Sequence, residues 1–395
     1  MRWHRSPASR SNVPGGEKFQ GPAPEEAIYT AQVNAHDILD ASLVLDGHTD
    51  VPTRLLRRPA DLTERQEDGH VDLPRLREGG VSALFWALFV PAGLSPAAGW
   101  EHVLALNAAL EGQLVPGQIE KAVSAEDVRR SVAAGAVAVL LGLENGRPLV
   151  STHALPQCAE MGVRYVTLTH NATHEWCDSA TDEERHGGLS DEGVKIVREM
   201  KRRGILVDVS HVSEDALLHA LDAVRCPVIA SHSSARALCD HPRNLPDSLL
   251  LEIARKGGVV GANAAPFFLD DEAAENAIAR GAEYRRIAAE LGDGDLEAHA
   301  EAYDEVVRRH PGPPVPLSRY VDHIVHLVEV AGEEHVGIGT DFDGIREVPV
   351  GFEDVSKIPA LVEEMAGRGM PERTIRMVLG ENFLRVLEEA ERLAY

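Results

Sequence analysis

Residues 205–234 read ILVDVSHVSEDALLHALDAVRCPVIASHSS, and this stretch decides the fold class. It contains two short apolar runs, Ile205–Val209 and Pro227–Ala230, separated by an amphipathic segment. Continuous apolar runs of this length are typical of strands buried on both faces, as in parallel sheets. Each run leads into a Ser-His pair, which ends in His211 or His232. The stretch therefore predicts a strand–helix–strand unit with a histidine at the carboxyl end of each strand.

The same alternation extends along the chain. Helical patterns such as Ser190–Arg203 and Ser213–Val224 separate most of eight apolar runs, which are Leu43–Asp46, Val81–Val90, Val137–Leu143, Val163–Thr169, Ile205–Val209, Pro227–Ala230, Gly258–Ala262 and His335–Gly339. Eight parallel strands with intervening helices predict an α/β fold of the (β/α)8 TIM-barrel type. An open doubly wound sheet is the alternative. We favour the barrel because polar residues follow many of the runs, and only a barrel brings those strand ends together at one mouth.

The predicted domain organisation is simple. Residues 1–35 are predicted to be a flexible N-terminal lead, and residues 36–395 a single barrel domain. A long insertion at residues 267–319 separates the seventh and eighth predicted strands, and Asp271–Leu291 and Asp295–Arg309 have helical patterns. A lid over the barrel mouth and a surface embellishment both remain open for this insertion.

Composition limits the possible partners. Of 395 residues, 39 are Lys or Arg and 63 are Asp or Glu, so the net charge is −24. Nucleic acid and anionic membranes would repel such a chain, and neither is expected as a partner. The four cysteines are too few for a disulfide framework, and residues 1–35 lack the apolar core of a signal peptide. We therefore expect a reducing, cytoplasmic setting.

Five residues at predicted strand ends suit a metal site. His48 and Asp50 are two residues apart, so an extended strand would place both on one side. Glu144 ends an otherwise apolar strand and needs a metal or an ion pair, for which Arg147 is the nearest alternative partner. With His211 and His232, the set combines imidazole and carboxylate ligands, which zinc accepts.

Five ligands exceed the three protein ligands of a typical catalytic zinc site. Two metals that share a carboxylate fit the count better, and Glu144 is the expected bridge because its strand lies between those of the other ligands. A carboxylated lysine is the rival bridge in some barrel hydrolases, but no lysine of this chain follows a predicted strand.

Three further residues are candidates for catalysis and substrate binding. Asp341 ends the eighth run and suits a general base, although Asp343 competes for that role. His170 ends the fourth run and suits an oxyanion donor, with a packing role as the alternative. Arg243 follows the sixth run and suits a substrate carboxylate, with a surface ion pair as the alternative. Other histidines lack this context, His174 and His186 being the nearest exceptions.

These motifs together resemble the membrane (renal) dipeptidase family of zinc peptidases, particularly its soluble bacterial members. The matching segments extend in order over about residues 40 to 390 and are LDGHTDVP at 45–52, GLENG at 142–146, LTHN at 168–171, DVSHVS at 208–213, SHSSA at 231–235, RNLPD at 243–247, GIGTDFDG at 337–344 and GENFLRV at 380–386.

The resemblance implies a distorted barrel with two Zn²⁺ ions per subunit. By resemblance, His48, Asp50 and Glu144 hold one ion, and Glu144, His211 and His232 hold the other. The family's substrate-contacting histidine, carboxylate-binding arginine and catalytic aspartate fall on His170, Arg243 and Asp341. A metal-dependent dipeptidase is therefore expected, in which a hydroxide between the two metals attacks the peptide carbonyl. The resemblance also implies tolerance of a C-terminal D-residue.

The sequence departs from the family in one motif. Asn263-Ala264-Ala265 replaces the common Asn-Phe-Tyr, which removes an expected tyrosine from the pocket. The sequence leaves open whether the chain forms a homodimer. The alternative function is that of a barrel amidohydrolase acting on cyclic amides, lactams or N-acyl amino acids.

Overall fold

The computed structural model describes residues 35–150, 154–291 and 295–394. Within these residues, eight parallel strands close into a barrel, because β2 pairs with β1 on one side and with β4 on the other. The barrel strands are β1 (Leu45–Thr49), β2 (Ala83–Phe89), β4 (Val137–Glu144), β5 (Val163–Thr167), β6 (Leu206–Asp208), β7 (Ile229–Ala230), β8 (Val259–Ala262) and β9 (Val336–Ile338). The predicted (β/α)8 barrel is therefore confirmed, and each of its strands overlaps a predicted run.

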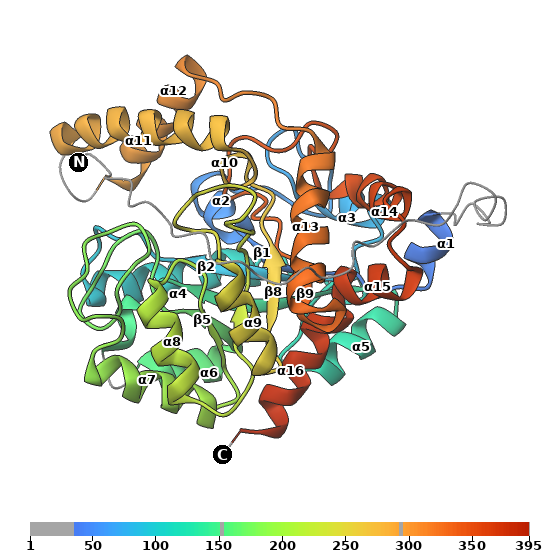
Figure 1. The fold of residues 1–395 in the computed structure, drawn as a ribbon, viewed down its shortest axis with the longest axis horizontal. Coiled ribbons are helices and arrows are strands. Elements are labelled where there is room, and N and C mark those ends of the chain that lie inside the picture. Colours follow the sequence, from blue (N-terminus) through green and yellow to red (C-terminus); the bar gives the residue numbers. More distant parts are fainter. Residues whose placement is uncertain (1–34, 151–153, 292–294, 395) are drawn as a thin grey trace, which may run out of the picture. The chain divides into compact units, whose positions relative to one another are not determined.

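Helices surround the barrel (Figure 1). They are α1 (Ala35–Asp40), α2 (Val51–Arg57), α3 (Leu73–Glu78), α4 (Pro96–Glu111), α5 (Ala125–Ala133), α6 (Ala154–Met161), α7 (Asp191–Arg202), α8 (Glu214–Ala223), α9 (Asp247–Arg255), α10 (Pro266–Leu269), α11 (Asp271–Leu291), α12 (Leu296–Arg309), α13 (Leu317–Ala331), α14 (Ile358–Gly367), α15 (Glu372–Arg376) and α16 (Asn382–Arg392).

Local sequence explains where these helices begin and end. Ser190 and Ser213 are the N-caps of α7 and α8, where each side chain accepts a hydrogen bond from the backbone N–H three residues later. Gly204 follows α7 with φ of +66°, a conformation that glycine adopts without steric cost. The helices predicted at Ser190–Arg203 and Ser213–Val224 are confirmed to within a residue at each end.

The barrel interior is a packed apolar core. Leu45, Phe85, Leu140 and Tyr165 are fully or almost fully buried there, and Phe383 of α16 belongs to the same cluster. Such a core leaves no channel through the barrel, so the polar residues at the strand ends are confined to its carboxyl-terminal mouth.

The structure adds one strand that the sequence patterns did not reveal. β3 (Ile119–Lys121) pairs in parallel with the start of β4 and lies outside the closed ring. Its three residues, Ile-Glu-Lys, form no apolar run, which explains why the pattern missed it.

The insertion consists of α10, α11 and α12, and its two long helices begin and end within one residue of the predicted bounds. In Figure 1 it lies at the top, toward which the arrowhead of β8 points. The predicted N-terminal lead, residues 1–35, lies outside the described residues except for Ala35, so the predicted domain boundary stays a prediction.

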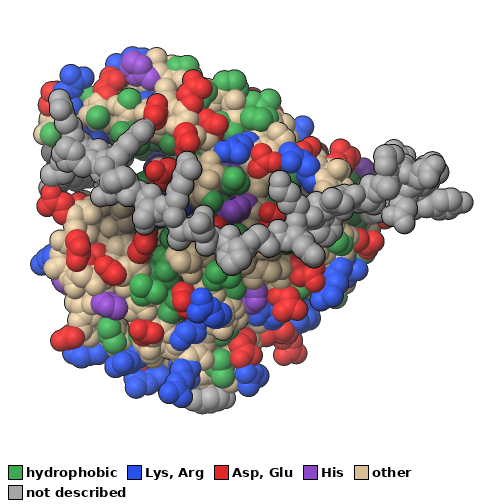
Figure 2. All heavy atoms as spheres, in the orientation of Figure 1, with side chains coloured by type: hydrophobic (Ala, Val, Ile, Leu, Met, Phe, Trp, Pro, Cys, Tyr) green, Lys and Arg blue, Asp and Glu red, His purple; other side chains and the backbone are tan. Residues whose placement is uncertain are grey.

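Charged side chains of both signs are interspersed over the face shown in Figure 2. Among the described helices, none combines the length and the apolar character needed to cross a bilayer.

Candidate metal centre

The five predicted metal ligands meet at the mouth of the barrel. His48 lies in β1 and Glu144 ends β4, while His211 and His232 follow β6 and β7. Asp50 is the N-cap residue of α2, and its carboxylate lies 3.4 Å from the Nε2 atom of His48. All five side chains are buried. The strand positions explain this convergence, because the carboxyl ends of all barrel strands surround one space.

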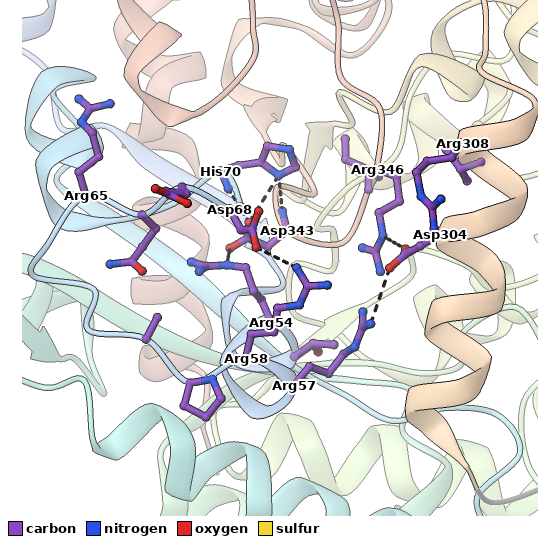
Figure 3. A pocket seen from close by; sticks show the side chains of 18 residues that line it. Arg54, Arg57, Arg58, Arg65, Asp68, His70, Asp304, Arg308, Asp343 and Arg346 are labelled. Atoms are coloured by element: carbon purple, nitrogen blue, oxygen red, sulfur yellow. Dashed lines mark hydrogen bonds and ion pairs between the residues drawn. The ribbon is translucent and has the colours of Figure 1, made fainter.

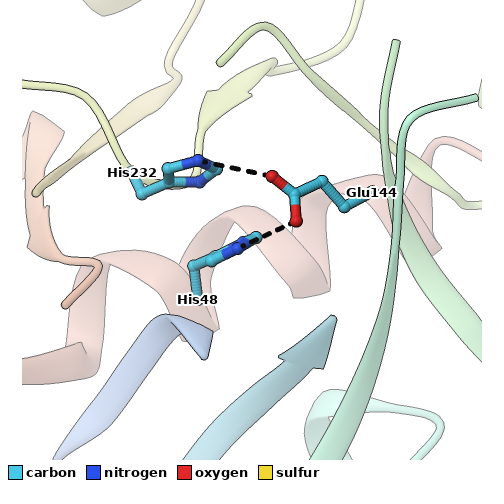
Figure 4. Close-up of side chains that lie close together, drawn as sticks. All are labelled: His48, Glu144 and His232. Carbon is cyan, nitrogen blue, oxygen red and sulfur yellow. Dashed lines mark ion pairs between the residues drawn. The ribbon is translucent and has the colours of Figure 1, made fainter. Parts of the chain in front are cut away.

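Glu144 lies at the centre of the cluster, and its two oxygens face different groups (Figure 4). Oε2 lies 3.5 Å from the Nε2 atom of His48. Oε1 lies 3.2 Å from Nε2 of His211 and 3.7 Å from Nε2 of His232. His170 also approaches Oε1, at 3.7 Å. Four imidazole rings thus present the same ring nitrogen to one carboxylate.

A hydrogen bond at the opposite nitrogen fixes each of the three histidines among the predicted ligands. Nδ1 of His48 lies 2.8 Å from the hydroxyl of Tyr165, and Nδ1 of His211 lies 3.0 Å from Oδ1 of Asn171. Nδ1 of His232 lies 2.8 Å from the hydroxyl oxygen of Ser231, and this hydroxyl donates its proton to Asp208. Such partners orient metal-ligating histidines and fix the ring nitrogen that faces the metal.

The sequence patterns predicted no role at the site for Tyr165, Asn171 or Ser231. Asn171 and Ser231 adjoin candidate histidines in the sequence, so adjacency was the only available signal. Tyr165 lies 117 positions from His48, and no local pattern connects the two residues.

The residues present fit a divalent metal. The Nε2 atom of His48 is buried without a hydrogen-bond partner among the described residues. The Nε2 atoms of His211 and His232 lie only 2.8 Å apart. Three triplets each bring one ligand atom per residue within 4.8 Å of one another: His48, Glu144 and His232; Glu144, His170 and His211; and His48, Asp50 and Asp341. Buried imidazole nitrogens and carboxylate oxygens are the donor set of zinc sites.

The structure distinguishes Asp341 from its competitor Asp343. The Oδ2 atom of Asp341 accepts a hydrogen bond from Nδ2 of Asn263 at 3.1 Å, and the residue faces His48 and Asp50. The Asp343 carboxylate instead accepts hydrogen bonds from Nε of Arg54 at 2.8 Å and from the backbone N–H of His70 at 2.6 Å. Asp343 is therefore held by Arg54 and His70, whereas Asp341 lies next to the candidate ligands His48 and Asp50.

Burial controls the electrostatics of these groups. It raises the pKa of Asp341 to about 7, and the nearby carboxylates of Asp50 and Glu144 add to this rise. Burial also lowers the pKa of His170 to about 3, with a further contribution from the positive charge of Arg243. His170 is therefore a neutral ring at neutral pH.

Arg243 is a buried cation, and no described carboxylate forms an ion pair with it. Its guanidinium donates hydrogen bonds to the Ser233 hydroxyl at 3.2 Å and to the His232 carbonyl at 3.0 Å. Its Nε atom has no hydrogen-bond partner among the described residues. The guanidinium also lies 5.3 Å from the ring centroid of Phe268. Burying a charge without a direct ion pair is costly, which favours an anionic ligand at this position.

Two alternatives from the sequence are wrong. Arg147 does not pair with Glu144, because it forms an ion pair with Glu175 at 2.8 Å. His174 and His186 belong to none of the three ligand triplets and have backbone partners instead: Nε2 of His174 forms a hydrogen bond with the carbonyl of Leu168, and Nε2 of His186 with the carbonyl of His174.

Two cavities lie near the cluster. One of about 610 Å³ is lined by Asp50, Glu144, His170, His211 and Asp341. The other, of about 670 Å³, lies beside α2 and contains none of the candidate ligands (Figure 3). Its arginines are paired with carboxylates, such as Arg54 with Asp343 and Arg58 with Asp68. The first cavity is therefore the candidate substrate pocket.

Comparisons with known proteins show which family and which solved structures this chain is similar to. Residues 32–395 match the family model described as membrane dipeptidase (peptidase family M19). The structure of the probable dipeptidase PvdM from Pseudomonas aeruginosa is 26% identical and has a TM-score of 0.81, and the match covers 94% of this chain and 100% of that one. A metallopeptidase from Rhodobacter sphaeroides, solved with a phosphinate mimic of the dipeptide L-Ala-D-Ala, is 26% identical with a TM-score of 0.72. That match covers 88% of this chain and 99% of that one.

Proposed function

The chain belongs to the membrane dipeptidase family, peptidase family M19, and is a metal-dependent dipeptidase; we propose that it uses two zinc ions bridged by Glu144 and accepts C-terminal D-residues. One observation carries the binuclear part of the proposal. The two oxygens of Glu144 face separate groups, with His48 on one side and His211 and His232 on the other. A carboxylate in this position can give one oxygen to each of two ions.

In this proposal, His48, Asp50 and Glu144 hold one ion, and Glu144, His211 and His232 hold the other. Zinc in such a site supplies Lewis acidity, which polarises a carbonyl and makes water a nucleophile at neutral pH. Tyr165, Asn171 and Ser231 keep the three histidine rings in their ligating orientation.

The remaining residues bind the substrate and transfer a proton from water to the leaving amine. Arg243 binds the free C-terminal carboxylate, since its buried guanidinium has no carboxylate partner among the described residues. Asp341, oriented by Asn263, accepts the proton of the attacking water and returns it to the leaving amine. The neutral ring of His170 donates a hydrogen bond to the oxyanion of the tetrahedral intermediate.

Acceptance of C-terminal D-residues rests on relatedness to the Rhodobacter sphaeroides enzyme, whose ligand mimics L-Ala-D-Ala. A carboxylate held by Arg243 fixes the end of the substrate but does not by itself select the configuration of the last Cα atom.

The test is metal removal and reconstitution with a dipeptide panel. We expect about two equivalents of zinc per chain by mass spectrometry, and restored cleavage of both L,L- and L,D-dipeptides. Glu144→Gln should lose bound zinc, whereas the control Glu175→Gln changes a half-exposed carboxylate and should keep it. Full activity with one equivalent of zinc would refute the binuclear centre. Cleavage of L,L-dipeptides alone would refute acceptance of D-residues.

A further inference from the structure

The inserted helices α11 and α12 form one side of the substrate cavity. Six of their residues line it: Tyr284, Ala288, Leu296, His299, Ala300 and Tyr303. The rings of Tyr284 and Tyr303 meet edge-on with centroids 5.4 Å apart. The hydroxyl of Tyr284 lies 3.1 Å from Nδ1 of His299. We call Tyr284, His299 and Tyr303 the aromatic wall.

Ion pairs fix α12 to the barrel rim. Arg57 of α2 contacts Glu297 at 3.0 Å and Asp304 at 3.7 Å. Arg346, which follows β9, contacts the same Asp304 at 2.5 Å, and Figure 3 shows Asp304 between the two arginines. A network of partly buried charges positions a helix better than isolated surface pairs do. The aromatic wall is therefore part of the assembled pocket.

The strand order, combined with the proposed carboxylate site at Arg243, indicates which end of a dipeptide faces this side of the cavity. Around the ring the order is β2, β1, β9, β8, β7, β6, β5 and β4, so β2 and β7 are diametrically opposite. Arg243 follows β7, and Phe89 ends β2 and lines the cavity. Arg57 and Arg346, which hold α12, follow β1 and β9. A substrate with its carboxylate at Arg243 therefore extends its N-terminal residue across the cluster toward Phe89 and α12.

We propose that the aromatic wall, together with Phe89, is the specificity pocket for a large apolar or aromatic side chain on the N-terminal residue of the dipeptide. The proposal rests on the function proposed above and names its preferred substrates. It gives the inserted helices a role in substrate selection, which the sequence patterns left open.

The chemistry of the lining supports an apolar side chain. Leu94, Leu106 and Leu296 line the same cavity as Phe89 and the aromatic wall. Aromatic rings that meet at their edges leave faces and edges on which another ring can pack, and such contacts add to the free energy of burial. The cavity of about 610 Å³ is within the usual range for small-molecule sites, so it has room for a bulky residue.

The experiment compares zinc-loaded enzymes on two substrates, L-Phe-D-Ala and L-Ala-D-Ala. We expect the unmodified enzyme to favour the phenylalanyl substrate in kcat/KM. Tyr303→Ala and Tyr284→Ala should lower kcat/KM for L-Phe-D-Ala by roughly ten-fold, mainly through KM, because a ring contact and buried apolar area are lost. In both alanine variants, kcat/KM for L-Ala-D-Ala should change by less than about two-fold.

Controls keep the result interpretable. Tyr303→Phe retains the aromatic ring and should keep the preference for L-Phe-D-Ala over L-Ala-D-Ala. Ile278→Ala changes an exposed residue of α11 that does not line the cavity, and it should behave as the unmodified enzyme. An unchanged substrate preference in both alanine variants would overturn the proposal, as would an enzyme that cleaves L-Ala-D-Ala faster than L-Phe-D-Ala. Failure to cleave any dipeptide in the full panel would overturn the proposed function as well.

Discussion

The Nδ1 atom of His48 lies 2.8 Å from the hydroxyl oxygen of Tyr165, and both side chains are completely buried. The hydroxyl reaches His48 from the barrel interior, where Tyr165 packs against Phe85. Gly142 of the adjacent strand leaves the space for this ring, because a Cβ atom there would overlap it. The packing of the barrel core thus determines the orientation of a candidate metal ligand.

Tyr165→Phe should weaken zinc binding by about 10- to 100-fold, since the ring of His48 loses the partner that orients it. Competition with a chromophoric chelator measures this affinity. The matched control is Tyr320→Phe, which removes another buried tyrosine hydroxyl, bonded to the Ala262 carbonyl. Equal zinc affinity in Tyr165→Phe and the unmodified enzyme would show that the hydroxyl does not support the site.

Asp341→Asn and Asp343→Asn should have different effects, although the two residues are only two positions apart. Asp341→Asn removes the proposed proton acceptor, so kcat should fall by about 10²- to 10⁴-fold while the protein stays folded. Asp343→Asn removes the charge that pairs with Arg54, so it should lower the free energy of unfolding by about 1–3 kcal/mol.

Kinetics and urea unfolding of the two variants separate these effects. A large loss of kcat in Asp343→Asn without a loss of stability would reverse the two assignments. Zinc content is measured in both variants, so that loss of metal is not mistaken for loss of a proton acceptor.

Arg243→Ala should lower kcat/KM on dipeptides by about 30- to 1,000-fold, because the substrate carboxylate would be buried without its cation. The control is a dipeptide amide, which has no terminal carboxylate. With the dipeptide amide as substrate, Arg243→Ala and the unmodified enzyme should have similar values of kcat/KM. A similar loss on both substrates would mean that Arg243 supports the pocket structurally instead of binding the carboxylate.

Lowering the pH should destabilise the protein through two buried histidines outside the cluster. Burial lowers the pKa of His174 and of His323 to about 4 in the folded state. The unfolded chain binds those protons near pH 6.5, so it binds more protons than the folded state between pH 6.5 and 4. The free energy of unfolding should therefore fall as the pH drops through this window, by up to about 1.4 kcal/mol per unit for each histidine.

His323→Gln tests this contribution. In the folded protein, Nδ1 of His323 accepts a hydrogen bond from the backbone N–H of Ala235, and Nε2 donates to the Leu269 carbonyl, so the neutral ring is required. The difference in unfolding free energy between the unmodified protein and His323→Gln should shrink from pH 7 to pH 5 in urea titrations. A difference that stays constant over this range would contradict the prediction.

The sequence by itself determined the barrel and the set of residues at its mouth. Buried parallel strands are continuous apolar runs, and a functional side chain at the carboxyl end of such a run reaches the mouth whatever the details of packing. The positions of Glu144, His211 and His232 could be predicted for this reason. β3 escaped prediction because a three-residue strand at the outer edge, Ile119–Lys121, needs no apolar run.

Only the tertiary structure decided how these residues are oriented and which neighbours they use. Asp343 accepts a hydrogen bond from Arg54, which is 289 positions away in the sequence. Asp341 accepts one from Asn263, which is 78 positions away. The contact of Tyr165 with His48, and the placement of α12 over the rim by Arg57 and Arg346, are equally non-local. Hydrogen bonds and ion pairs act over a few ångströms in space and leave no periodic pattern in the sequence, so these relationships exist only once the barrel has closed.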